Sequence, residues 1–262
     1  MTFRDIELTI EDPVAILRLN RPDKLNAFTY DTLREIRAAI DACVADTRVV
    51  GIVITGNGRG FCAGLDAATL AAVTSAPAEP RAADPDTLPG IFSYLLEVPK
   101  PVIAAINGVC LGGGLELAMA CHLRICGDRA RLGQPEINLG IIPGWGGTQR
   151  LARIVGPAKA TELILTGDQI TAQQAMQLRL VNMVVPGGEV MRQAKGLAAK
   201  IANKSAVAVA AAMTAIRAGL DADLPTGLAA ERTQFDFVLS SEDAREGITA
   251  FLEKREAKFS DK

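Results

Sequence analysis

Two apolar runs constrain the fold of this chain more than any other feature. Residues 48–55 read RVVGIVIT and residues 101–106 read PVIAAI. Near-continuous aliphatic runs of this length, rich in β-branched residues, are typical of strands that are buried on both faces. Stretches with apolar residues at helical spacing, such as residues 31–45, separate such runs. Alternation of strands and helices predicts an α/β fold with a mainly parallel sheet.

The two ends of the chain depart from this alternation. Residues 5–20 alternate apolar and polar side chains around Asp12-Pro13, which predicts a hairpin. From about residue 155 the spacing is helical, and helices are expected over 157–166, 171–179, 188–202, 205–219, 226–239 and 241–257. We therefore expect an α/β core over residues 1–195 and a helical region over residues 196–262. In the core, 115–121 is expected to be helical and 123–126 a short strand, and the Ala- and Pro-rich stretch 67–90 is interpreted as a flap.

Charge and composition exclude several classes of protein. The net charge is −2, from 28 basic and 30 acidic residues without a block of like charge, so no nucleic acid and no membrane partner is expected. The N-terminus has no apolar signal region, and the longest uncharged stretch, 101–115, is short for a membrane span. Five cysteines without paired spacing indicate reduced thiols. The expected location is cytoplasmic.

Three familiar site patterns fail in this sequence. The cluster GNGRGFCAG at residues 56–64 has Phe61 where a dinucleotide loop needs its third glycine. A Ser-His-Asp system would need His122, the only histidine, whose neighbours have the pattern of a core helix. Cys121, His122 and Cys126 lack a second ligand pair, so no metal site is predicted.

The segment LGGGLELAMA at residues 111–120 is the most informative for chemistry. Three consecutive glycines allow the backbone to approach another group closely, and a helix start offers unpaired N–H groups to a developing oxyanion. Glu116 follows within an otherwise apolar run, where a carboxylate is costly unless it is paired or functional. The alternative is a glutamate that points to solvent or complements the helix dipole.

Glu136 stands in a second glycine-rich apolar segment, RLGQPEINLGIIPGWGGTQR at residues 131–150. Alone it would be an ordinary loop glutamate. Together with Glu116 it forms a pair of isolated acids whose surroundings can separate the roles of general acid and general base, provided that the two segments converge.

Five blocks of this sequence resemble the enoyl-CoA hydratase/isomerase, or crotonase, family. They are NRPDKLNAF (20–28), GRGFCAGLD (58–66), PVIAAINGVCLGGGLELAMAC (101–121), GQPEINLGIIPGWGGTQRL (133–151) and EGITAFLEKREAKF (246–259). The resemblance implies a crotonase-like spiral of ββα units with a helical C-terminal region that mediates trimerisation, and a homotrimer or a hexamer formed from two trimers. It implies an oxyanion hole made by the N–H groups of Leu65 and Gly113, with Glu116 and Glu136 as the catalytic carboxylates.

The resemblance also implies where CoA lies. Arg21 and Lys24 match positions near the phosphates, and Phe251 and Lys254 match tail positions that reach the CoA of an adjacent subunit. Simple packing and a solvated lysine are the alternative for those two tail residues. The remaining positions along the CoA chain are Leu25, Ala27, Ala63, Leu65 and Asp66.

The activity that the resemblance implies is hydration of a 2-trans-enoyl-CoA to a 3-hydroxyacyl-CoA. CoA enters as part of the substrate, and no metal or redox cofactor is expected. A double-bond isomerase, which relies on the carboxylate at position 136, and other acyl-CoA enzymes of the fold are alternatives. A remote alternative is RNA binding, known for a relative that bears a lysine-rich helix. The corresponding helix here has no lysine, and acidic neighbours oppose Arg34 and Arg37, which disfavours binding of nucleic acid.

Departures from the family pattern bear on the substrate. His122 stands where many relatives have Asp, and a structural role is expected for it. Ala67 and Ala68 stand where many hydratases have a lysine that contacts CoA. Trp145 replaces a small residue and either shapes the acyl pocket or fills space. The acyl group is therefore left open.

Overall fold

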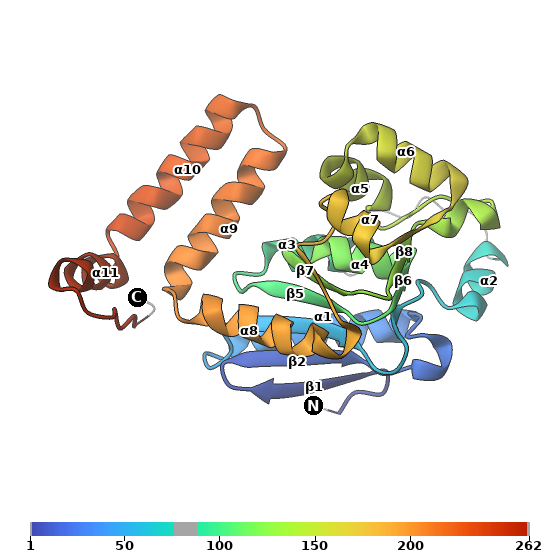
Figure 1. Cartoon of the computed structure of the whole chain (residues 1–262), viewed down its shortest axis with the longest axis horizontal. Helices are drawn as coiled ribbons and strands as arrows, with labels where there is room; N and C mark the ends of the chain where they lie inside the picture. Colours follow the sequence, from blue (N-terminus) through green and yellow to red (C-terminus); the bar gives the residue numbers. More distant parts are fainter. Residues whose placement is uncertain (1, 76–87, 261–262) are drawn as a thin grey trace.

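The computed structural model describes residues 2–75 and 88–260, which form two β-sheets covered by helices (Figure 1). The larger sheet has six strands in the order β1-β2-β3-β5-β7-β10. Only β1 and β2 are antiparallel, and they form the hairpin expected over residues 5–20. The strands are β1 (Ile6–Glu11), β2 (Val14–Leu19), β3 (Gly51–Gly56), β5 (Val102–Ile106), β7 (Leu123–Gly127) and β10 (Met183–Val185).

The smaller sheet has the order β4-β6-β8-β9, with β9 antiparallel to β8 and the other pairs parallel. Its strands have three residues each: β4 (Gly60–Cys62), β6 (Val109–Leu111), β8 (Arg131–Gly133) and β9 (Gln169–Thr171).

A spiral relates the two sheets. β3, β5 and β7 each enter the larger sheet, and the strand that follows each of them enters the smaller sheet beside the strand of the previous turn. Helices complete the turns: α2 (Ala67–Ser75) and α3 (Leu88–Glu97), then α4 (Gly113–Ala120), then the 3₁₀ turn η2 (Pro135–Leu139) and α5 (Gly147–Val155). The expected spiral of ββα units is confirmed.

Both faces of the larger sheet are covered, which explains the two apolar runs. Ile52 and Ile54 of β3 join one core cluster, with α1 (Tyr30–Ala45), α3 and α4, whereas Val53 joins a second cluster under α8 (Val190–Ala202). Ala194 and Ala198 face the sheet from α8, and such small side chains let the helix lie close to the strands. All residues of β3 and β5 are buried, as expected.

The C-terminal helices lie where the helical spacing places them. α9 and α10 form an antiparallel hairpin that extends away from the sheets, with α11 beyond it (Figure 1). Residues 195 and 196, the expected boundary between core and helical region, lie within α8. The helices after α5 are α6 (Pro157–Thr166), α7 (Ala172–Gln177), α8, α9 (Ala206–Leu220), α10 (Leu224–Leu239) and α11 (Glu242–Glu253); short 3₁₀ turns are η1 (Pro22–Lys24) and η3 (Gly187–Glu189).

Two expectations need correction or restriction. The helical interpretation after residue 155 missed β9 and β10, because three-residue strands carry too little periodicity to register. The flap expected over residues 67–90 begins as α2 and ends in α3, and residues 76–87 lie outside the described residues. Within the described ranges, no helix has the length and apolar character needed to cross a membrane.

Candidate active site

A cavity of about 260 Å³ opens where α4 begins, and it contains the sequence-predicted Glu116, Glu136, Leu65 and Gly113. The spiral brings these residues together from the segment after β4, from α4 and from η2, although up to 71 positions separate them in the chain. Its lining residues are Tyr30, Ala63, Gly64, Leu65, Leu70, Gly112, Gly113, Glu116, Pro135, Glu136, Leu139, Ile141, Ile142, Gly144 and Trp145.

Glu116 lies one turn into α4 and is only 1% exposed, so the alternative of a solvent-facing glutamate is wrong. Its Oε1 accepts hydrogen bonds from the backbone N–H groups of Trp145 and Gly147, both at 2.7 Å. Position 147 must be glycine, because a Cβ there would lie 2.9 Å from the same oxygen. Burial raises the pKa of Glu116, and the two N–H donors together with the positive charge of Arg150 oppose that rise.

Glu136 is half-buried in the first turn of η2, with its carboxylate against Gly112. A Cβ at position 112 would lie 3.0 Å from Oε1, and φ of Gly112 is +53°, so the residue is glycine for both reasons. When its amide nitrogen faces Glu136, buried Gln134 donates to both carboxylate oxygens, at 2.9 and 3.1 Å. Burial, with a smaller contribution from the charge of Glu116, raises the pKa of Glu136 to about 7.

The two carboxyl groups therefore differ in environment. Backbone donors hold Glu116, and the nearby guanidinium of Arg150 favours its ionised form. Burial and the like charge of Glu116 instead raise the pKa of Glu136, which favours its neutral form. Such a difference is the arrangement that separates a general base from a general acid.

Leu65 and Gly113 both line the cavity. Gly113 is the first residue of α4, where helical N–H groups have no acceptor within the helix. Phe28 bonds to Gly64 and Asp66 on either side of Leu65, so the N–H of Leu65 faces away from Phe28. A Cβ on Gly64 would lie 3.3 Å from the nitrogen of Gly113, which shows how closely the two segments approach.

Of the positions expected along CoA, Ala63 and Leu65 line the cavity. The segments 21–27 and 63–66 are joined by a hydrogen bond from Ala63 N to Leu25 O at 3.0 Å. Lys24 is exposed, whereas Arg21 is engaged: it pairs with Asp66 at 3.1 Å and donates to Ala27 O. The structure thus adds a bracing role for Arg21 that the sequence did not indicate.

Phe251 and Lys254 do not reach this cavity in the same chain. Phe251 is 82% exposed on α11, and Lys254 is the left-handed residue that ends that helix. In Figure 1, α11 lies at the opposite end of the molecule from α2.

Sequence reasoning missed several residues that shape the site. Gln134, Gly147 and Arg150 all lie inside the block 133–151, which carried the family resemblance, but neither a backbone donor nor a buried amide has a sequence pattern of its own. Trp145 holds Glu116 through its backbone N–H, which donates to Oε1. Its ring packs at 5.7 Å from Phe92 and 6.4 Å from Phe28, centroid to centroid.

His122 has the structural role expected for it. Its Nδ1 accepts a hydrogen bond from Val102 N at 3.1 Å, at the start of β5. No group of three or more His, Cys, Asp or Glu side chains in the described part of the chain is arranged to hold a metal ion.

Comparison with known proteins agrees with this geometry. The sequence model of the family described as Enoyl-CoA hydratase/isomerase matches residues 9–262. The chain is 41% identical to crotonyl-CoA hydratase of Syntrophomonas wolfei over 99% of both chains, and 41% identical to short-chain-enoyl-CoA hydratase of Clostridium acetobutylicum over 97% of both. The crystal structure of enoyl-CoA hydratase from Bacillus anthracis superposes with a TM-score of 0.91 at 36% identity, covering 99% of this chain and 100% of that one. The resemblance of the five sequence blocks is thereby confirmed, and the chain belongs to the enoyl-CoA hydratase/isomerase family.

Proposed function

We propose that the chain is an enoyl-CoA hydratase, a lyase that adds water to a 2-trans-enoyl-CoA and forms a 3-hydroxyacyl-CoA, with Glu116 and Glu136 as its catalytic residues. The observation that carries the proposal is that one cavity is lined by buried Glu116, by half-buried Glu136, whose carboxyl group is held differently, and by Leu65 and Gly113. The names of the family relatives support the reaction, and the geometry supports the roles that we propose for the residues.

The thioester oxygen binds to the N–H groups of Leu65 and Gly113. These donors stabilise negative charge that spreads from C2 onto the oxygen, and they make C3 electrophilic. The dipole of α4 acts in the same direction, because Gly113 is at its N-terminus.

A water molecule between the two carboxyl groups then adds to C3. Ionised Glu116 accepts a proton from this water as the C3–O bond forms. Protonated Glu136, whose pKa is raised to about 7, gives its proton to C2. The elements of water are thus added across the C2–C3 double bond, and a proton transfer from Glu116 to Glu136 restores the starting state.

CoA is bound as part of the substrate, and the mechanism needs no metal or redox cofactor. We place the CoA chain along the rim formed by residues 21–27 and 63–66, with exposed Lys24 near the phosphates. Arg21 contributes there mainly by holding Asp66 and the Ala27 carbonyl in position.

The test is hydration of crotonyl-CoA, followed as loss of the conjugated thioester absorbance, by the wild type, Glu116→Gln and Glu136→Gln. Both variants should lose at least about 10²-fold in kcat, because each lacks one proton-transfer group. Full activity in Glu116→Gln would refute the two-carboxylate mechanism. Double-bond migration without hydration would identify the isomerase alternative, in which Glu136 works alone.

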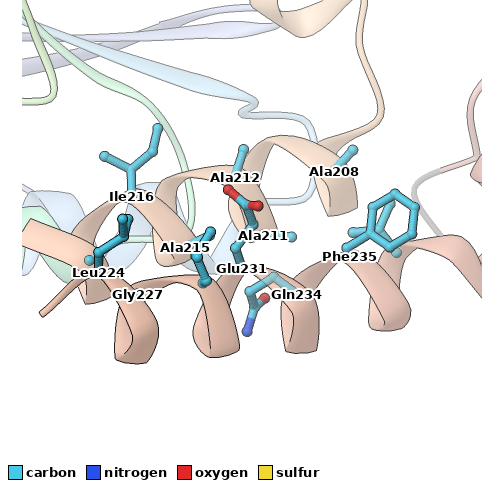
Figure 2. Close-up of a pocket in the computed structure, with 13 residues that line it drawn as sticks. Ala208, Ala211, Ala212, Ala215, Ile216, Leu224, Gly227, Glu231, Gln234 and Phe235 are labelled. Carbon is cyan, nitrogen blue, oxygen red and sulfur yellow. The ribbon is translucent and has the colours of Figure 1, made fainter. Parts of the chain in front are cut away.

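We further propose that the chain assembles as a homotrimer, or as two such trimers, through its C-terminal helices. α9 and α10 leave a hollow of about 490 Å³ between them, lined mostly by alanine and larger apolar side chains such as Ile216 and Phe235 (Figure 2). Those two side chains are 67% and 56% exposed, and Leu224 is 74% exposed. A monomer rarely exposes a continuous apolar surface of this kind, which supports burial against another copy.

Residence in the cytoplasm is supported by the thiol content. All five cysteines are free and buried, and burial raises the pKa of Cys62 and Cys121 to about 12. Unpaired thiols of this kind suit a reducing compartment.

A further inference from the structure

Arg150 lies one turn into α5, and the proposed mechanism gives it no role. Its side chain is half-buried and turns back over the start of the helix. Nη1 donates to the carbonyl oxygen of Trp145 at 2.7 Å, and Nη2 lies 3.4 Å from Ser93 Oγ of α3. An arginine that is withdrawn from water to bind one backbone carbonyl requires an explanation.

The backbone of residues 145–147 is held from two sides. On one side the N–H groups of Trp145 and Gly147 donate to Glu116 Oε1, and on the other side the carbonyl of Trp145 accepts from Arg150. Gly146 between them has φ of +103°, and a Cβ there would lie 2.1 Å from Nη1. The guanidinium therefore packs directly on the short segment that holds the carboxylate.

The charges around Glu116 point the same way. Arg150 from α5 lowers the pKa of Glu116, and Glu116 in turn raises that of Arg150, in both cases against the effect of burial. Glu136 faces Glu116 from η2, as the charge that raises its own pKa. The strands β4 and β6 also pack on α4. Their titratable groups are the thiols of Cys62 and Cys110, which burial keeps neutral by raising their pKa values.

We propose that Arg150 is a positioning residue, which fixes the backbone of residues 145–147 so that it holds Glu116 as an ionised carboxylate directed at the substrate. The inference rests on the proposed function, in which Glu116 is the general base. Arg150 acts through the segment 145–147 and through its positive charge, without touching the substrate.

The experiment measures kcat and KM for crotonyl-CoA from about pH 5 to 9 in the wild type, Arg150→Gln, Arg150→Lys and Arg153→Gln. Arg150→Gln should lower kcat about 10- to 100-fold with little change in KM, because a misplaced base costs rate more than binding. Without the positive charge Glu116 ionises less readily, so the acidic limb of the kcat/KM profile should move to higher pH. The alkaline limb, set by deprotonation of Glu136, should stay in place.

Two variants separate this effect from a general loss of structure. Arg150→Lys keeps a positive charge and should restore part of kcat, with an acidic limb nearer to that of the wild type. Arg153, one turn further on the same helix, is exposed and pairs with Asp221, so Arg153→Gln should behave as the wild type. If Arg150→Gln does not fold, Gly146→Ala is measured instead. Its added methyl group pushes the guanidinium aside although the arginine is still present, and the acidic limb should move in the same direction.

A fall in kcat with both limbs unmoved, or a change confined to KM, would overturn the inference. Glu116→Gln is measured in parallel to separate the two levels of the proposal. An inactive Glu116→Gln beside a normal Arg150→Gln would remove the role of Arg150 alone. An active Glu116→Gln would remove the role of Glu116, and the positioning role with it.

Discussion

Trp145 is the only tryptophan of the chain, and its ring lies beside Gly113, one of the two proposed oxyanion donors. A Cβ on Gly113 would lie 2.4 Å from its Cζ3, and the ring packs edge-on against Phe92. We therefore predict that the indole limits the length of the acyl chain. Trp145→Ala should raise kcat/KM for an eight-carbon enoyl-CoA relative to crotonyl-CoA by about tenfold or more, since fitting added methylenes is worth 1–3 kcal/mol.

The control for that prediction is Leu139→Ala, which shortens another cavity residue that is already 68% exposed. It should leave the ratio of the two substrates close to that of the wild type. An unchanged ratio in Trp145→Ala would mean that the ring only fills space, the other interpretation that the sequence left open.

His122 gives the fold a specific sensitivity to acid. Its Nδ1 accepts a hydrogen bond from the N–H of Val102, so the ring is neutral. Burial, with smaller contributions from Arg124 and Arg217, lowers the pKa of His122 against an opposing contribution from the backbone of Leu96. The unfolded chain takes up this proton near pH 6.5, and the folded chain only at lower pH. The contribution to the free energy of unfolding is therefore complete above about pH 6.5 and is lost as the pH falls toward the pKa of the folded state. Its size is about 1.4 kcal/mol for each unit by which folding lowers the pKa of His122.

His122→Asn tests this directly, because Asn Oδ1 occupies the place of Nδ1 and can accept the same hydrogen bond without titrating. Urea unfolding at pH 7, 6 and 5 should show a smaller loss of free energy of unfolding in the variant than in the wild type. Equal losses would show that other groups determine the acid sensitivity.

Helix α4 is placed by its three glycines, each of which meets a different neighbour. A Cβ on Gly112 would meet the carboxyl group of Glu136, and one on Gly113 would meet the ring of Trp145. A Cβ on Gly114 would lie 2.1 Å from the carbonyl oxygen of Cys62 in β4. Gly114→Ala should therefore push the helix start away from β4 and separate the N–H groups of Leu65 and Gly113, the proposed oxyanion donors. We predict a fall in kcat of about 10²-fold or more, measured with crotonyl-CoA, together with a lower melting temperature.

Gly196 is the matched control, because it is also helical, in α8, but has no atom near enough to meet a Cβ. Gly196→Ala should stabilise the protein by about 0.4–1 kcal/mol and leave kcat unchanged. If Gly114→Ala were equally harmless, close contact with β4 would not be what sets the position of α4.

The sequence predicted those elements whose environment leaves a mark on composition. β3 and β5 were recognisable because helices cover both faces of their sheet, and α1 because only one of its faces is buried. β9 and β10 were missed because three residues show no period. In the site, the glutamates stood out as acids in apolar segments, whereas the donors that hold Glu116 are backbone groups, which any residue could provide.

The proposed assembly bears on whether one chain alone can hold CoA. Phe251 and Lys254 stand at the end of α11, which lies at the opposite end of the molecule from α2 (Figure 1), so the proposed contact with CoA requires a neighbouring copy. Leu224→Glu places a charge on the exposed apolar face of α10, where it should prevent association, and the mass measured by light scattering should fall to that of one 27.6 kDa chain. Because CoA then lacks its contacts from the neighbour, KM for crotonyl-CoA should rise about tenfold, while the two carboxyl groups and the N–H donors, all within one chain, keep kcat within a fewfold.

Lys254→Ala should raise KM less and leave the assembly intact. A monomeric Leu224→Glu variant with unchanged KM would show that CoA is bound by a single chain, and that the exposed Phe251 serves packing between copies instead.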